Sequence, residues 1–240
     1  MRAIQFRWLS GLAEAGVRGM VGGAIALLAI GWGAVCYGQS PIVIYTNDFN
    51  SSSGGLSTLG VGQYTAKFAW GGAYGTGGSA SWYLIYPGDK KEEQMLTTPA
   101  ITVLGTGPVT VSFNHKWSWE DDRPGDGTIY DGAQLDISTD AVTYTYVTNG
   151  AFTAGGYEMS RTFGGGTVSG WPMGAYTWAW TNWNYTKSGD ASFIHSVANL
   201  GTFTTGTKIY LRFRASTDDG GGGSQSPAWV IDNLVLNTTS

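Results

Sequence analysis

The strongest constraint on the fold is a strict alternation of apolar and polar side chains along residues 109–119. One face of this segment would carry Val109, Val111, Phe113, His115, Trp117 and Trp119, and the opposite face Thr110, Ser112, Asn114, Lys116 and Ser118. A period of two residues is typical of a β-strand with one buried face. Because His115 falls on the apolar face, we expect a buried histidine with hydrogen-bond partners rather than a catalytic group.

The same alternation recurs in residues 133–138 and 208–216, and no helical i, i+3, i+4, i+7 stripe follows residue 40. In the second segment Ile209, Leu211, Phe213 and Ala215 would point inward, and Lys208, Tyr210, Arg212 and Arg214 outward. Further strands are expected at residues 41–49, 64–70, 81–86, 95–103, 143–148 and 229–236. Of these, 95–103 contains Pro99, which suits a sheet edge. Residues 151–185 show no clean period, which indicates a long loop or irregular strands.

Composition narrows the fold class further. Glycine accounts for 38 of the 240 residues, aromatic residues for 14% and charged residues for 12%. Disordered chains are rich in charge and poor in aromatics, and the glycines follow no collagen repeat, so both classes are excluded. Short strands at this spacing predict an all-β sandwich or barrel, with Trp and Tyr in the core and Gly at the corners. Residues 41–240 have the length of one such domain.

Residues 1–38 have the features of a secretory signal peptide. Three arginines make the start basic, and residues 20–36 are uncharged and mostly apolar. Small residues follow, so we expect cleavage between Cys36 and Ser40, a secreted or cell-surface protein, and no membrane span after cleavage. The alternative is an uncleaved anchor, because the apolar run is just short of the ~18 to 20 residues of a membrane span.

The charge balance excludes one class of partner. The leader holds three arginines and one glutamate of the 13 basic and 17 acidic residues, which leaves 10 basic and 16 acidic residues. Nucleic-acid binding needs a basic stripe, so nucleic acid is not an expected partner. Cys36 is the only cysteine, so no disulfide framework is expected either.

Four segments carry a family resemblance: 46–49 (TNDF), 109–120 (VTVSFNHKWSWE), 130–140 (YDGAQLDISTD) and 206–236, which contains IYLRFRASTDDGGGG and AWVIDNLVL. They resemble the bacterial jelly-roll modules that are related to MAM domains and follow the catalytic domain in secreted metallopeptidases of the immune inhibitor A type. The resemblance covers most of residues 41–240. It implies a two-sheet antiparallel jelly roll, an extracellular setting, adhesion or ligand capture, and often a structural calcium. The chain lacks the cysteines of eukaryotic MAM domains, which fits the bacterial relatives.

Two acidic groups are candidate sites for that calcium, which takes oxygen ligands from carboxylates, amides and carbonyls. The first is Asp48 with Asn50 on the opening strand and Asp232 on the closing strand. The resemblance implies that these strands lie near each other and hold a metal between them. Alternatively, Asp232 accepts hydrogen bonds from backbone donors where the last strand enters. If calcium is bound, chelation is expected to lower the melting temperature.

The second acidic group is a loop cluster made of Glu120, Asp121, Asp122, Asp126, Asp131, Asp218 and Asp219. Carboxylates gathered on two glycine-rich loops repel each other unless a cation or Arg123 lies among them. The alternative is a solvated acidic rim, which needs no ligand because surface charges usually face water.

A glycine-rich segment is the candidate ligand-binding region, because flat aromatic faces with polar neighbours commonly hold sugar rings. Its candidate residues are Trp171, Tyr176, Trp178, Trp180 and Trp183. The alternative for each ring is core packing, because an all-β domain needs large side chains to fill its interior.

Catalytic motifs are missing from the sequence. It has two histidines, and it lacks the H-E-x-x-H zinc motif and the G-x-S-x-G nucleophile elbow. The sequence therefore predicts a secreted, non-catalytic jelly-roll module that binds an extracellular glycan or surface protein. One alternative is a glycoside hydrolase or polysaccharide lyase on the same fold, in which Glu158 or Asp190 would face another acid. A purely structural surface protein is the other.

Overall fold

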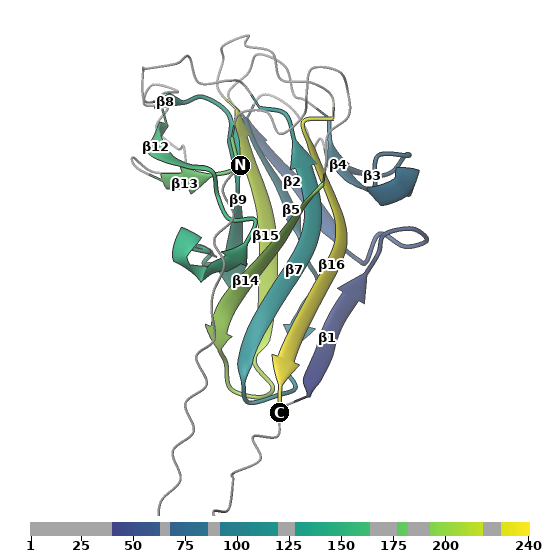
Figure 1. Cartoon of the computed structure of the whole chain (residues 1–240), viewed down its shortest axis with the longest axis vertical. Coiled ribbons are helices and arrows are strands. Elements are labelled where there is room, and N and C mark those ends of the chain that lie inside the picture. Colours follow the sequence, from purple (N-terminus) through teal and green to yellow (C-terminus); the bar gives the residue numbers. More distant parts are fainter. Residues whose placement is uncertain are drawn as a thin grey trace, which may run out of the picture. The chain divides into compact units, whose positions relative to one another are not determined.

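Two antiparallel β-sheets packed face to face make up the computed structural model (Figure 1). This arrangement confirms the predicted two-sheet sandwich. The structure describes residues 40–62, 68–85, 92–119, 128–163, 177–181, 193–217 and 227–240. All of them fall within one unit, Gly38–Ser240. The predicted signal peptide lies outside the described residues.

The first sheet has the strand order β11-β14-β7-β16-β4-β3, with β1 paired to β16 beside this path. Its strands are β1 (Pro41–Asn47), β3 (Phe68–Gly71), β4 (Ser81–Leu84), β7 (Pro108–Trp117), β11 (Phe152–Ala154), β14 (Ile194–Thr202) and β16 (Trp229–Thr239). The first and last strands pair antiparallel, from Pro41 opposite Thr239 to Asn47 opposite Leu234. The terminal strands are therefore neighbours, as the resemblance implies.

The second sheet has the order β10-β9-β15-β5-β2, with β6 also paired to β15. Its strands are β2 (Ser57–Gly62), β5 (Glu92–Thr97), β6 (Ile101–Thr102), β9 (Gly132–Ser138), β10 (Thr145–Tyr146) and β15 (Lys208–Thr217). A small third sheet joins β8 (Thr128–Ile129), β12 (Met159–Phe163) and β13 (Thr177–Ala179). Short 3-10 turns lie at Thr76–Gly78 (η1) and Asn149–Ala151 (η2). Among the described residues, no helix is long and apolar enough to cross a membrane.

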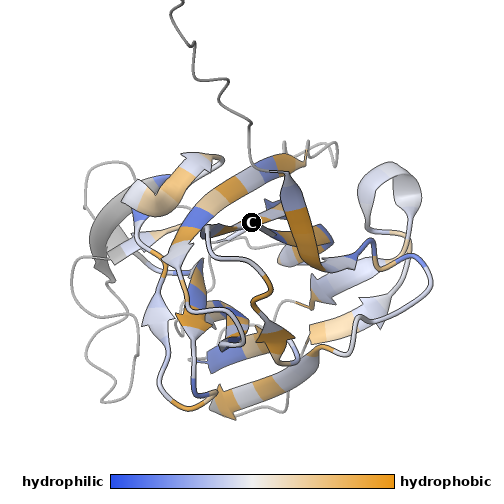
Figure 2. Cartoon of the chain, turned by 90° about the horizontal axis from the view of Figure 1, so that it is seen from below, coloured by the Kyte–Doolittle hydropathy of each residue, from blue (hydrophilic) through white to orange (hydrophobic). Residues whose placement is uncertain are grey.

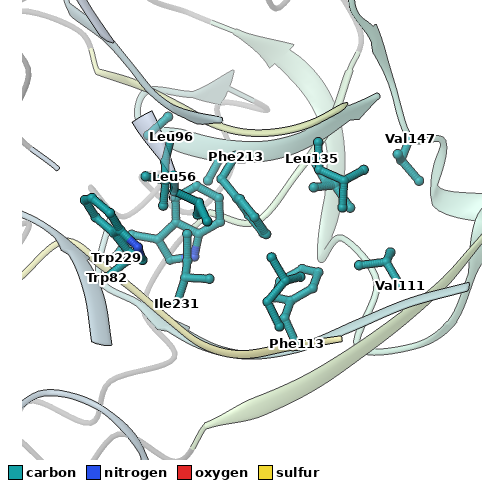
Figure 3. Close-up of a cluster of buried hydrophobic side chains, with 14 of the residues drawn as sticks. Leu56, Trp82, Leu96, Val111, Phe113, Leu135, Val147, Phe213, Trp229 and Ile231 are labelled. Atoms are coloured by element: carbon teal, nitrogen blue, oxygen red, sulfur yellow. The ribbon is translucent and has the colours of Figure 1, made fainter. Parts of the chain in front are cut away.

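The core lies between the two sheets and is built from the inward positions of the alternating strands. In Figure 2, hydrophobic and hydrophilic residues alternate in bands along the strands. Phe113 of β7 and Phe213 of β15 meet edge to face, with ring centroids 5.1 Å apart. Figure 3 shows both rings among Leu135, Trp229 and Ile231. Burying one such side chain stabilises the fold by about 1.5–3 kcal/mol, so the period-two pattern supplies the main driving force.

Part of the core is aromatic and carries one histidine. The ring of Trp180 lies 4.5 Å from those of Tyr157 and His115, and 5.8 Å from that of Phe113. An isolated bridge between Ala133 and Trp180 ties the end of β13 to the second sheet. Side chains on different strands therefore share one aromatic cluster, which contains the predicted buried histidine.

Several expected strands differ from the observed ones. Residues 95–103 form two strands rather than one, because Pro99 lies in the break between β5 and β6. The expected edge position is also wrong, since β5 lies between β15 and β2. Of the strand expected at residues 143–148, only the two residues of β10 form a strand. In contrast, β7, β9, β15 and β16 lie where strands were expected, and β7 shows the expected alternation in burial.

The end of β16 is clamped by the turn that precedes β7. The backbone N–H groups of Thr106 and Gly107 donate to the carbonyl oxygen of Thr239 at 3.1 and 3.0 Å. A Cβ atom on Gly105 would lie 2.2 Å from the same oxygen. Only glycine fits there, because that spacing is far below van der Waals contact.

Candidate functional site

The outer face of the second sheet carries charged side chains that strand alternation places there. Leu135 of β9 and Phe213 of β15 lie in the core. Because successive side chains of a strand point to opposite faces, Asp136, Arg212 and Arg214 point away from the core. The register places Arg212 directly opposite Asp136, so a cation and an anion meet across the strand pair.

Asp136 is the centre of this group. Its Oδ2 accepts hydrogen bonds from Nε and Nη2 of Arg212, at 3.0 and 2.7 Å, and lies 3.5 Å from Nη1 of Arg214. The Nε atom of Arg214 in turn pairs with Oε1 of Glu93 on β5. We call Glu93, Asp136, Arg212 and Arg214 the charged cluster. Its two positive and two negative formal charges cancel.

The charged cluster is buried although it lies on an outer sheet face. The side chains of Asp136 and Arg214 are 1% and 8% exposed. Within the part of the chain that the structure describes, Oδ1 of Asp136, Nη2 of Arg214 and Oγ of the nearby Ser216 make no hydrogen bond. A buried polar atom without a partner costs about 1–3 kcal/mol. The charged cluster therefore holds an unused acceptor and an unused donor on two adjacent side chains.

Burial also acts on the acid at the other end of the cluster. Desolvation raises the pKa of Glu93, and the guanidinium groups of Arg214 and Arg212 oppose that rise. Removing water disfavours the ionised carboxylate, whereas a nearby cation favours it. Since the pKa of Glu93 is raised overall, ion pairing inside the cluster does not fully compensate the lost hydration.

Aromatic residues border the charged cluster. The ring centroid of Tyr144 lies 4.0 Å from Cζ of Arg212, which is a cation–π contact. Tyr146 of β10 stands opposite Asp136 in the register and is 40% exposed. Planar rings thus lie on and beside the guanidinium group at the edge of the sheet.

The predicted calcium ligands are all described, and each has protein partners. Both carboxylate oxygens of Asp48 accept hydrogen bonds from Asn50, from its backbone N–H at 3.1 Å and from Nδ2 at 3.0 Å. Asp232 is 1% exposed; its Oδ2 accepts from the N–H of Thr76 at 2.8 Å and its Oδ1 from the N–H of Asn233 at 2.9 Å. These backbone bonds account for the burial of Asp232, in line with the alternative given by the sequence.

The carboxylate oxygens of Asp48 and Asp232 thus already accept hydrogen bonds from protein donors. Within the described ranges, no group of three or more His, Cys, Asp or Glu side chains is placed to hold a metal ion. Of the predicted loop cluster only Asp131 is described; it is fully buried, and its carbonyl oxygen accepts a bond from Oγ1 of Thr181 at 2.8 Å. The remaining members, Glu120, Asp121, Asp122, Asp126, Asp218 and Asp219, lie outside the described residues.

Of the aromatic residues predicted to bind a ligand, some are described by the structure and others are not. Trp180 is fully buried in the aromatic cluster, so its ring has no free face for a ligand. Trp178 is partly buried against the core, and its carbonyl oxygen accepts a bond from Nε2 of Gln134 at 2.8 Å. Trp171, Tyr176 and Trp183 lie outside the described residues.

The two histidines have structural surroundings. His115 is fully buried, as expected; Nε1 of Trp229 donates to its Nδ1 at 3.1 Å, and its Nε2 lies 2.8 Å from Oγ of Ser196. Desolvation lowers the pKa of His115 to about 3, so the ring is neutral at physiological pH. His195 is exposed and bonds to Oδ1 of Asn114 at 2.8 Å.

The enzyme alternative rests on Glu158 and a second acid. Glu158 retains exposed surface, and its backbone N–H donates to the carbonyl oxygen of Ala179 at 3.2 Å. Asp190, the other acid that the sequence proposes, lies outside the described residues. The described residues include Glu158 but not Asp190, so the enzyme alternative stays a prediction.

The sequence did not single out the charged cluster as a site. It placed Arg212 and Arg214 correctly on the outward face, but it did not indicate that Arg214 is buried there. A signal was present, since the outward positions of two predicted strands carry the charged side chains of Asp136, Arg212 and Arg214. Only the register pairs these charges, and register is not visible in a single sequence.

Neither a protein-family model nor a curated protein matches the sequence. Among solved structures, the K1 cleaved adhesin domain of Lys-gingipain from Porphyromonas gingivalis aligns with 84% of this chain and 99% of its own, at 11% identity and a TM-score of 0.43. The CBM22-1 xylan-binding domain from Paenibacillus barcinonensis Xyn10C aligns over 85% and 98%, at 10% identity and a TM-score of 0.38.

A third solved structure is longer than the present chain. This chain aligns over 82% of its length with a Clostridium thermocellum xylanase 10B fragment that contains CBM22-1 and GH10 modules, and spans 28% of that protein, at 10% identity and a TM-score of 0.39. Likeness at this level does not identify the ligand of the present chain.

Proposed function

We propose that the chain is an extracellular, non-catalytic glycan-binding module whose ligand binds at the charged cluster. The observation that carries the proposal is the unused acceptor on Asp136 beside the unused donor on Arg214. A sugar hydroxyl donates one hydrogen bond and accepts others, so one hydroxyl of a polyol would satisfy both atoms. Filling them would remove the cost of two unpartnered buried groups.

The tyrosines at the sheet edge support a sugar rather than another polar ligand. Tyr144 covers the guanidinium of Arg212, and Tyr146 offers an exposed ring beside Asp136. A binding site that combines aromatic walls with a few convergent polar groups is the usual form of a small-ligand site. Because the formal charges of the cluster cancel, a neutral glycan suits it better than a polyanion.

Access to the buried atoms requires a small movement. In the free protein the unused atoms of Asp136 and Arg214 have almost no exposed surface. Strand β10 has two residues and pairs only with β9 within the described residues, so we place the movement at this short edge strand. The proposed site therefore opens at the β10 edge when the ligand binds.

The experiment compares two tyrosines of equal exposure. Tyr146 is 40% exposed next to the charged cluster, and Tyr74 is 41% exposed beside Tyr83, near the first sheet. On a glycan array, followed by titration of the best neutral oligosaccharide, Tyr146→Ala is expected to lose binding about tenfold or more. Tyr74→Ala is expected to bind like the natural chain.

Three outcomes would contradict the proposal. They are an array without hits, equal binding by Tyr146→Ala and the natural chain, and the release of reducing ends from a bound polysaccharide. The last outcome would instead support the glycoside hydrolase alternative. Binding to a surface protein with no glycan would support the other predicted class of ligand.

Export and calcium are parts of the proposal that rest on the sequence and the resemblance. The described oxygens of Asp48 and Asp232 already accept protein hydrogen bonds, so any calcium would have to draw ligands from elsewhere or displace those bonds. A melting curve of the natural chain that does not change on addition of EDTA would contradict the calcium. Recovery of the chain only inside cells would contradict export.

A further inference from the structure

A pocket of about 550 Å³ lies on the other side of β10 from the charged cluster. Its lining residues come from the β9–β10 edge of the second sheet, from Leu200 of β14 in the first sheet and from Phe203, which follows β14. Its lining consists of Ile137, Ser138, Thr139, Asp140, Thr143, Thr145, Leu200 and Phe203. The volume lies in the range of small-ligand sites, which is about 300–1,000 Å³.

The lining is divided between an apolar floor and a polar rim. Ile137, Leu200 and Phe203 form the floor, and all three pack against the hydrophobic core. The rim carries hydroxyl groups and the carboxylate of Asp140. A ligand that fits this lining has one apolar face and several hydroxyl groups on its edge.

The charge of the pocket lining narrows the class of ligand further. Hydrogen bonds from the N–H groups of Val142 and Thr143 lower the pKa of Asp140 to about 2, so its carboxylate stays ionised near neutral pH. Among the described residues that line the pocket, no arginine or lysine balances this charge. An anionic ligand is therefore disfavoured, and a neutral polyol ring is suited to the rim.

Residues 143–146 form a wall shared by the pocket and the charged cluster. Thr143 and Thr145 line the pocket, whereas Tyr144 contacts Arg212 and Tyr146 stands opposite Asp136. This is the period-two alternation of an extended segment. Threonine and tyrosine variants in this segment can therefore address the two sites separately.

We propose that the pocket under β10 is a second binding site, which takes a single neutral sugar ring with its apolar face on Phe203 and Leu200 and its hydroxyls toward Thr143, Thr145 and Asp140. The inference rests on the proposed function for the class of ligand, but it stands on a different cavity and on different residues.

The test titrates the full-length chain with the methyl glycosides of glucose, galactose and mannose. Methyl NMR signals of Ile137, Thr143, Thr145 and Leu200 are expected to shift and saturate with at least one of them. Cyclohexanol, which matches the ring size with a single hydroxyl, is expected to give a much weaker response. Thr145→Val keeps the shape of the side chain, removes its hydroxyl, and is expected to weaken glycoside binding about tenfold.

Two control variants separate this site from the charged cluster. Val142 is 83% exposed and does not belong to the pocket lining, so Val142→Ala is expected to bind glycosides normally. Tyr146→Ala is also expected to keep the pocket response, even where it abolishes oligosaccharide binding at the charged cluster. The melting temperature of each variant shows whether it is folded.

The second site is overturned by any of three results. No methyl glycoside gives a saturable shift, cyclohexanol binds as well as the glycosides, or Thr145→Val binds as well as the natural chain. If Tyr146→Ala instead keeps its oligosaccharide binding while the pocket response is present, the site proposed at the charged cluster fails and the pocket stands.

Discussion

Two buried polar networks, one in the core between the sheets and one on the outer face of the second sheet, differ in how completely their hydrogen bonds are made. The first joins Trp229, His115, Ser196 and the carbonyl oxygen of Gly155 through three contacts of 3.1, 2.8 and 2.5 Å. With the proton of neutral His115 on Nε2, each group in this chain donates to the next. The charged cluster has stronger interactions but leaves buried atoms on Asp136 and Arg214 unused.

The difference separates a structural role from a ligand-binding role. A network that satisfies all its members has nothing left to offer a ligand, and it specifies one arrangement of the core. A network with unused buried atoms is destabilised in the free protein and gains when a partner fills them. This difference supports our proposal of a binding role for the charged cluster, whereas the histidine network stabilises the fold.

The largest expected effect breaks the satisfied network. Replacing His115 by Ala leaves Trp229 and Ser196 without their partner and opens a cavity inside the aromatic cluster. We expect a loss of about 4 kcal/mol in the free energy of unfolding, measured by urea denaturation. The matched control is the exposed His195→Ala, which is expected to change stability by about 0.5 kcal/mol or less. Similar losses of stability for His115→Ala and His195→Ala would contradict the structural role of the histidine network.

The next effect concerns the charged cluster. Asp136→Ala leaves the guanidinium groups of the partly exposed Arg212 and the buried Arg214 without their central anion and is expected to cost about 3 kcal/mol. Replacing all four members of the charged cluster by apolar residues of similar size is expected to restore most of that stability, because buried ion pairs contribute little net free energy. This quadruple variant should still fail to bind glycan. If it binds normally, the charged cluster is structural.

The pH dependence of the free energy of unfolding tests the structural role of the histidine network. The unfolded chain protonates His115 at an ordinary pKa near 6.5, whereas burial lowers the pKa of His115 in the folded chain to about 3. Below pH 6.5 the unfolded state therefore binds the additional proton, and stability falls as the pH falls. Between pH 6.5 and 5 we expect a loss of about 2 kcal/mol from this group, at about 1.4 kcal/mol per pH unit.

The control for this prediction is His115→Gln, which keeps a donor and an acceptor but does not titrate. Its free energy of unfolding, measured at the same two pH values, is expected to change much less than that of the natural chain. An equal slope in both proteins would show that other groups carry the acid sensitivity.

The sequence predicted those strands whose inward residues are large. Strand β7 was visible because its inward side carries rings and valines. Strand β14 was missed because its inward positions, Ser196 and Ala198, carry small side chains. Ala198 stands opposite Val111 in the register, and the hydroxyl of Ser196 contacts the ring of His115. Strand β2 was missed for a different reason. Its large apolar residues, Leu59 and Val61, are 56% and 51% exposed. The usual pattern, with large apolar side chains on the buried face, is therefore inverted in this strand.

The sites were harder to predict than the fold, because they depend on pairing rather than on periodicity. Nothing local distinguishes Trp180, which fills the core, from Trp178, which lies at its margin. Asp232 satisfies the backbone of Thr76, a residue far away in the sequence. The charged cluster needs β9, β15 and β5 in one register before its charges meet. Each of these features depends on contacts between residues far apart in the sequence, and a single sequence does not reveal such contacts.

The position of β16 constrains how the chain acquires its structure during synthesis. This strand pairs with β1, β4 and β7, and it follows all three in the chain. Until residues 229–239 are made, β1 has no partner among the described strands, and the β3–β4 pair is not joined to β7, β14 and β11. Such distant pairings fold slowly. The part of the first sheet that contains β1, β3 and β4 is therefore joined to β7 only after residues 229–239 have been made.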